Sequence, residues 1–180
     1  MQSVANCYLP VTLTPDQNLR KQNMAATLLF PLDQIDRSHT LCDKAEIDRY
    51  LPQSGHMRMI DRVIWISELG TSAFGERIIR DDEFWVEGHI PGRPIFPGVL
   101  MIEAAAQLCS IAHTRLGRTT GFLGFTRCDD VVFRGQVVPG DHFYLLSKEV
   151  SYNVRRFVSQ TQGIVNDKLV FEATITGMAI

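Results

Sequence analysis

His89 and Glu103 carry the side chains best suited to acid–base chemistry in this chain. His89 lies in the segment GHIPGRPIFPG, where Pro91, Pro94 and Pro97 at every third position make the backbone stiff. Histidine titrates near neutral pH and is the commonest general base. Glu103 lies in an otherwise apolar stretch, and burial of a carboxyl favours its neutral, proton-donating form. The two residues are predicted to form an acid–base pair.

Each residue also has a plain structural interpretation. A lone histidine in a loop more often caps or fills that loop, and a glutamate in the first turn of a helix can point to solvent, where the helix dipole favours it. The catalytic interpretation gains weight from a polar stripe. Glu103, Gln107, Ser110 and Thr114 follow one another at spacings of four, three and four, which places them on one side of a helix.

A long helix is predicted to carry this stripe. Pro97 and Gly98 open the segment GVLMIEAAAQLCSIAHTRL, and Gly117 is expected to end the helix in a left-handed conformation. Apolar residues face every direction, which is typical of a helix enclosed by other structure. The backbone N–H groups of Gly98 and Val99 lie in the first turn without intrahelical partners, so they could hold an oxyanion. Equally, Pro97 and Gly98 could simply begin the helix.

The remaining pattern predicts an antiparallel sheet around this helix, an α+β fold. The segments RVIWISELG and TSAFGERIIR indicate a hairpin joined at Gly70. Residues 1–25 are predicted to form a flexible leader, and residues 26–180 are predicted to form a single domain. Within that domain, residues 26–50 indicate a strand or loop followed by a helical turn. Beyond Gly117, strands are expected near 121–127, 129–138, 142–151, 154–165 and 168–178, with hairpin turns at 139–141 and 166–167.

Composition restricts the function classes. The chain has 180 residues and a formal net charge of -2, so it lacks the basic field that gathers nucleic acid. Its four cysteines form no Cys-x-x-Cys pair, which argues against a zinc site and a disulfide framework and fits a reducing cytoplasm. No segment approaches the roughly 18 apolar residues of a membrane span.

The run GHIPGRPIFPGVLMIEAAAQ resembles the active-site segment of the FabZ-type β-hydroxyacyl-acyl carrier protein dehydratases, G-H-F-P-x-x-P-x-x-P-G-V-L-x-x-E-A-x-A-Q. Only the family's phenylalanine differs, as Ile90. The similarity extends over roughly residues 51–178. It implies the hotdog fold, in which a curved antiparallel sheet wraps a long helix, and the dehydration of a 3-hydroxyacyl thioester in fatty-acid biosynthesis.

The resemblance also implies roles for individual residues. His89 takes the C2 proton, the Gly98 and Val99 amides polarise the thioester carbonyl, and Glu103 protonates the departing hydroxyl. Gln107 and Pro97 support these residues. Each active site combines the histidine of one subunit of a homodimer with the glutamate of the other, and whether dimers associate further into hexamers stays open. A related branch that also isomerises the double bond has aspartate in place of Glu103, so plain dehydration is expected.

No metal or organic cofactor is expected, because the phosphopantetheine thioester that activates C2 belongs to the substrate. The expected partner is acyl carrier protein, which is acidic. Basic residues are the candidates for docking acyl carrier protein, although a single surface arginine is more often simply solvated. Apolar residues are the candidates for the acyl tunnel, although most apolar residues simply form the core. The docking candidates are Arg93, Arg115, Arg118, Arg155 and Arg156, and the tunnel candidates are Ile95, Phe96, Leu100, Phe122 and Phe125.

One segment departs from the family pattern. Where the family usually reads L-P-H-R-Y-P-F-L-L-V-D-R-V, this chain reads LPQSGHMRMIDRV, so chain-length preference does not carry over. Two other functions remain open on the same fold, an acyl-thioesterase and a non-catalytic module that binds acyl carrier protein. Release of free thiol without a 2-enoyl product would favour the first, and binding without turnover would favour the second.

Overall fold

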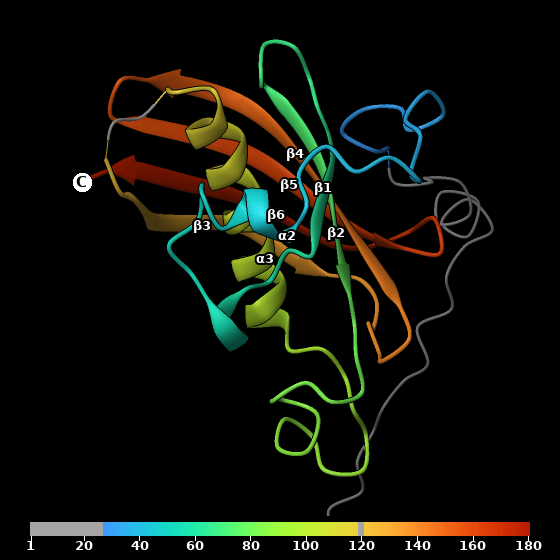
Figure 1. Cartoon of the computed structure of the whole chain (residues 1–180). Coiled ribbons are helices and arrows are strands. Elements are labelled where there is room, and N and C mark those ends of the chain that lie inside the picture. Colours follow the sequence, from blue (N-terminus) through green and yellow to red (C-terminus); the bar gives the residue numbers. More distant parts are fainter. Residues whose placement is uncertain (1–26, 119–120) are drawn as a thin grey trace, which may run out of the picture.

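A single antiparallel sheet of six strands and one long helix, α3, make up most of the computed structural model, which describes residues 27–118 and 121–180 (Figure 1). The strand order is β1-β2-β4-β5-β6-β3, and α3 packs against one face of the sheet. The predicted α+β hotdog fold is confirmed, and the expected leader, residues 1–25, lies outside the described residues. The elements are α2 (Lys44–Ile47), the 3₁₀ helix η1 (Gly55–Met57), β1 (Arg62–Ile66), β2 (Ser72–Ile78), α3 (Gly98–Arg115), β3 (Leu123–Phe133), β4 (His142–Asn153), β5 (Arg156–Val165) and β6 (Lys168–Ala179).

Helix α3 begins and ends where the sequence predicts. Pro97 precedes its first residue, and Gly117 follows with a φ of 63°, the left-handed conformation that commonly ends a helix. The helix comes close to β2, since a Cβ on Gly75 would lie 3.0 Å from the Leu108 side chain. The expectation that α3 is enclosed on all sides is wrong for this chain alone, because one side is open and Val99 there is 71% exposed.

Two hairpins agree with the predicted turns. β1 pairs with β2, and β5 pairs with β6 through Asn166 and Asp167, whose φ angles of 49° and 60° are those of a type I′ turn. The predicted hairpin at residues 139–141 is wrong. A turn does form there, but β3 lies at the edge of the sheet and pairs with β6, while β4 lies between β2 and β5.

The predicted strands 121–127 and 129–138 are a single strand, β3. Its pairing with β6 shifts register twice, between Phe125 and Arg127 and between Asp129 and Val132. Asp130 has a φ of 51°, so the backbone bends within the strand and then continues along the same partner. The polar residues at this bend resemble a turn in the sequence, although no new strand begins there.

Residues 27–38, here called the N-terminal strap, cover the sheet face opposite α3. Leu32 packs in a cluster with Phe74, Leu146 and Ile164, separate from the main core around α3. The strap is fastened at the Gln162 side chain, which accepts from the amide of Leu29 at 2.9 Å and donates to the carbonyl of Thr27 at 3.1 Å. This explains the apolar run at the start of the predicted 26–50 segment.

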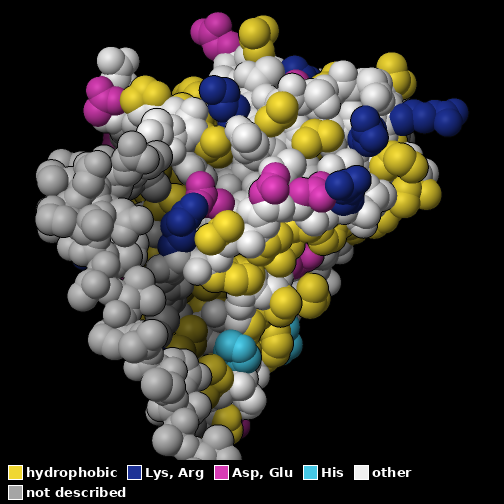
Figure 2. Space-filling model, turned by 180° about the vertical axis from the view of Figure 1, so that it is seen from behind, with side chains coloured by type: hydrophobic (Ala, Val, Ile, Leu, Met, Phe, Trp, Pro, Cys, Tyr) yellow, Lys and Arg dark blue, Asp and Glu magenta, His cyan; other side chains and the backbone are white. Residues whose placement is uncertain are grey.

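Seen from behind, the molecule shows hydrophobic side chains in patches between charged ones (Figure 2). Several large apolar side chains on β3 and just before it are exposed, including Phe122, Phe125 and Phe133. β3 is also an edge strand, so its outward backbone groups have no partner strand among residues 27–118 and 121–180. None of the helices in the described ranges is long and apolar enough to cross a membrane.

Candidate active site

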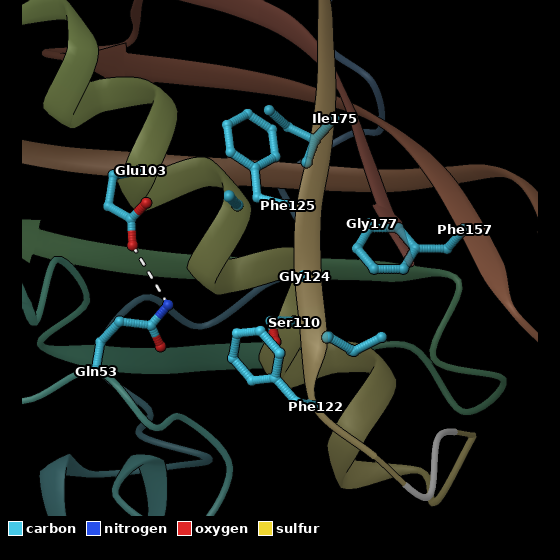
Figure 3. Close-up of a pocket in the computed structure, with 11 residues that line it drawn as sticks. Gln53, Glu103, Ser110, Phe122, Gly124, Phe125, Phe157, Ile175 and Gly177 are labelled. Carbon is cyan, nitrogen blue, oxygen red and sulfur yellow. Dashed lines mark hydrogen bonds between the residues drawn. The ribbon is translucent and has the colours of Figure 1, made fainter. Parts of the chain in front are cut away.

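Glu103 lies at a cavity of about 140 Å³ between α3 and the edge strand β3 (Figure 3). The cavity is mostly apolar, and Glu103 is the only acidic residue among the described residues that line it. The Glu103 side chain is half-buried, so it is partly withdrawn from solvent while still reaching the cavity. The other lining residues are Gln53, Ala106, Ser110, Phe122, Leu123, Gly124, Phe125, Phe157, Ile175 and Gly177.

Two amide side chains hold the Glu103 carboxyl. Gln107, one helical turn along α3, donates its Nε2 hydrogen to Glu103 Oε1 at 2.7 Å. Gln53 donates to the same oxygen at 3.4 Å from the segment before η1. The second carboxyl oxygen points away from Gln53 (Figure 3). This arrangement orients the carboxyl, and the described part of the chain places no hydrogen-bond donor on the second oxygen.

Gln107 also ties α3 to the segment around η1. Its side chain is 1% exposed and, besides Glu103, it donates to the Met57 carbonyl at 2.6 Å and accepts from the Met59 amide at 2.8 Å. The sequence places Gln107 beside Glu103 on the polar stripe but does not predict these backbone contacts. They connect the orientation of Glu103 to the packing of residues 53–59.

We expect Gln107→Leu to lower the free energy of unfolding by about 2–4 kcal/mol, because the buried Met59 amide and the part-buried Met57 carbonyl lose their partner. Urea titration followed by circular dichroism measures this change. Gln160→Leu, at an exposed position on β5, is the control and should stay within about 0.5 kcal/mol of wild type. Equal stability of the two variants would show that Gln107 does not hold the segment.

His89 lies in the irregular segment between β2 and α3, which extends from the body of the molecule (Figure 1). Its amide donates to the Trp85 carbonyl at 2.9 Å, and its Nδ1 lies 2.7 Å from the Ile95 carbonyl. A carbonyl oxygen only accepts, so Nδ1 carries a hydrogen, and in the neutral imidazole Nε2 is the nitrogen with the lone pair. The imidazole is exposed and oriented, as a general base requires.

His89 is not among the residues that line the Glu103 cavity. One chain therefore carries an exposed imidazole on a loop and, separately, a carboxyl in a cavity beside an edge strand. The resemblance drawn from the sequence implies that the two meet across a subunit boundary. Their separate placement in one chain is compatible with that expectation.

The first turn of α3 provides free amides near the His89 loop. The amides of Leu100 and Met101 both bond to the Pro97 carbonyl, so those of Gly98 and Val99 precede the intrahelical ladder. They are available to a negatively charged oxygen at the positive end of the helix. Gly98 also lies under the Phe133 ring, which a Cβ would approach to 2.7 Å. Close packing is therefore a second reason for glycine here.

The tunnel candidates do not lie together. Phe122 and Phe125 line the Glu103 cavity, whereas Phe96 is 1% exposed in the main core between Trp85 and Phe143. Ile95 and Leu100 are partly buried and do not line this cavity. The sequence did not predict Gln53, Phe157, Ile175 or Gly177 as site residues. The last three alternate inward along β5 and β6, a pattern that can identify a core-facing residue but not a cavity.

The basic docking candidates have different surroundings. Arg93, Arg115, Arg155 and Arg156 are exposed. Arg118 is engaged within the chain, because it pairs with Glu149 at 2.7 Å and its guanidinium lies over the Tyr152 ring. In the part of the chain that the structure describes, no group of three or more His, Cys, Asp or Glu side chains could hold a metal ion.

Comparison with known proteins identifies relatives over most of the chain. A family model described as a FabA-like domain matches residues 51–174. A protein of Saccharophagus degradans named 3-hydroxyacyl-[acyl-carrier-protein] dehydratase FabZ is 34% identical over 139 residues, which are 75% of this chain and 95% of the relative. A protein of the same name from Teredinibacter turnerae is 37% identical over 139 residues, 75% of this chain and 94% of the relative.

Solved structures share the fold at low sequence identity. The dehydratase heterocomplex ApeI:P from Xenorhabdus doucetiae has a TM-score of 0.63 and 14% identity, covering 74% of this chain and 90% of its own. Cj0977, a sigma28-regulated virulence protein from Campylobacter jejuni, has a TM-score of 0.59 and 14% identity, covering 81% of this chain and 96% of its own. At these identities the likeness concerns the fold alone.

Proposed function

This chain belongs to the FabA-like family, and from that membership we propose that it is a hydro-lyase acting on acyl carrier protein thioesters. It removes water from a (3R)-3-hydroxyacyl group to give the trans-2-enoyl group, in fatty-acid biosynthesis. The observation that carries the proposal is the Glu103 carboxyl, held by two amides at an apolar cavity, in a chain whose His89 has a free Nε2.

The proposed reaction consists of two proton transfers. His89 Nε2 takes a proton from C2 of the thioester, and the electron pair moves toward the thioester carbonyl, where the Gly98 and Val99 amides stabilise the negative oxygen. The C2–C3 double bond forms as the C3–O bond breaks. Glu103 donates its proton to the departing hydroxyl, which leaves as water. The proton on His89 then returns to Glu103 through solvent and restores both residues.

The working unit is a homodimer with shared active sites. His89 of one subunit and Glu103 of the other form each pair, which is consistent with their separate placement in one chain. The unpaired edge of β3 and the exposed Phe122, Phe125 and Phe133 beside it offer an apolar contact surface of the kind that subunit interfaces cover. A monomer is therefore expected to be inactive.

The remaining features of the function follow from the residues. The reaction ends at the 2-enoyl product, because Glu103 stands where the isomerising branch has aspartate. It needs no metal or organic cofactor, since every step is a proton transfer on a substrate activated by its own thioester. Acidic acyl carrier protein docks at four exposed arginines, Arg93, Arg115, Arg155 and Arg156. The fifth docking candidate, Arg118, forms an ion pair with Glu149 of the same chain. The enzyme works in the cytoplasm.

The test offers purified protein (3R)- and (3S)-3-hydroxyacyl-acyl carrier protein in separate reactions. We expect conversion of the (3R) thioester alone, seen as the ultraviolet absorbance of a conjugated enoyl thioester and as loss of one water by mass spectrometry. Thiol titration reports thioester hydrolysis and chromatography reports a 3-enoyl isomer, and neither product is expected. Thiol release without enoyl product would replace the proposal by a thioesterase.

A further inference from the structure

Gln53 occupies a place in the active-site cavity that the proposed mechanism does not yet use. The residue lines the cavity with Glu103, and its Nε2 donates to Glu103 Oε1 at 3.4 Å. Its own Oε1 is buried and, within the described part of the chain, has no hydrogen-bond partner. Buried amide oxygens are normally satisfied, so an acceptor left free beside a reacting group points to a missing donor.

The backbone of Gln53 is fixed by hydrogen bonds, so the position of its side chain is defined by the fold. The Gln53 carbonyl accepts from Arg58 Nε at 3.2 Å and from Nη2 at 2.8 Å. Arg58 is only 8% exposed and forms an ion pair with Asp48, which follows α2. The Gln53 backbone is therefore held in place, and the Gln53 side chain contacts Glu103 within the cavity lining.

The missing donor can be identified from the reaction. A departing 3-hydroxyl that receives a proton becomes water, which has two O–H groups. One of these hydrogens comes from Glu103, and the other is the original hydroxyl hydrogen, which needs its own acceptor in a cavity lined mainly by apolar side chains. Figure 3 shows Gln53 with its nitrogen toward Glu103 and its oxygen on the side of Phe122 and Ser110.

We infer that Gln53 is a catalytic residue that accepts the hydroxyl hydrogen of the departing water through Oε1 while Nε2 orients Glu103. This inference rests on the proposed dehydration. Atoms balance as in that reaction: C3–O breaks, the oxygen leaves with its own hydrogen and with the Glu103 proton, and Gln53 is unchanged. An amide suits this double role because it donates and accepts at the same time without ionising.

The first test compares Gln53→Leu with Ser110→Ala. Ser110 also lines the cavity, and its hydroxyl oxygen could accept the same hydrogen. With 3-hydroxyacyl-acyl carrier protein, Gln53→Leu is expected to lower kcat by about tenfold to a hundredfold with KM within about threefold. Ser110→Ala should lower kcat by much less than Gln53→Leu does, and Gln160→Leu, at an exposed position on β5 outside the cavity, should stay within about twofold of wild type. The reverse pattern would assign the acceptor to Ser110 and overturn the inference.

A changed leaving group separates this role from a structural one. A 3-chloroacyl thioester loses chloride, which needs neither a proton from Glu103 nor an acceptor for a hydroxyl hydrogen. Gln53→Leu should therefore eliminate chloride within about twofold of wild type, after subtraction of the rate with His89→Ala. Equal losses with both substrates would show that Gln53 only supports the fold.

Gln53→His provides a second test, the pH dependence of kcat, which can be measured even if Gln53→Leu does not fold. A neutral imidazole can donate and accept, but an imidazolium only donates. The ratio of Gln53→His to wild-type kcat is therefore expected to fall as the pH drops below about 6.5, the ordinary pKa of histidine. A ratio independent of pH would overturn the inference. An inactive wild type would instead overturn the proposed function, and the inference with it.

Discussion

His89→Ala is expected to lower kcat for dehydration of 3-hydroxyacyl-acyl carrier protein by at least about a hundredfold, with the fold unchanged. The imidazole is exposed on a loop, so its removal leaves no cavity in the core. It supplies the only proposed acceptor for the C2 proton, and loss of a general base typically costs 10²–10⁴-fold in rate. Initial rates of enoyl absorbance at saturating substrate measure the change.

Glu103→Gln should cause a loss of the same order, because an amide matches the shape of the carboxyl but cannot give a proton to the leaving hydroxyl. The matched controls are His39→Ala and Glu87→Gln, at exposed positions outside the cavity. Both should stay within about twofold of wild type. Near-normal turnover in His89→Ala, with circular dichroism and dimer size unchanged, would exclude the proposed mechanism.

Mixing the two inactive variants is expected to restore activity. In a dimer of one His89→Ala and one Glu103→Gln subunit, one site carries both substitutions and the other carries neither. Random exchange makes about half of the dimers mixed, so the mixture should recover about a quarter of wild-type activity. The measurement is the enoyl formation rate after the variants are co-refolded at equal concentration.

A site built within one subunit gives a different outcome. Every site in a mixed dimer would then lack either His89 or Glu103, and the rate would stay at the level of the separate variants. Co-refolding wild type with the double variant His89→Ala/Glu103→Gln is the control. Its mixed dimers should retain no intact site if sites are shared, and one intact site if they are not.

The sequence was sufficient for the elements that depend on local chemistry. Pro97 marks the start of α3 because its ring fixes its own φ, whereas Gly117 ends the helix and Asn166 and Asp167 form a tight turn because these residues tolerate the positive φ that they adopt. The position of β3 could not be inferred in this way. Its partner β6 lies far along the chain, and Asp130 bends the strand without ending it, so the local signal indicated a hairpin where the fold makes a crossover.

The site shows the same division. The spacing of Glu103 and Gln107 along one helix predicts that they meet, and their side chains bond at 2.7 Å. The contact from Gln53 depends on how residues 53–59 fold over α3, which no periodicity encodes. The departure of that segment from the family pattern was the one available signal that it could matter.

The N-terminal strap has a consequence for the order in which the chain acquires structure. The amide of Leu29 bonds to Gln162, which lies 133 residues away in sequence, and the Arg37 guanidinium bonds to Asp167, 130 residues away. Such contacts close long loops before they return any stabilisation, whereas the β5–β6 hairpin closes locally. The strap therefore docks only after the C-terminal hairpin exists. During synthesis from the amino terminus, the first described residues to leave the ribosome are among the last to reach their native place.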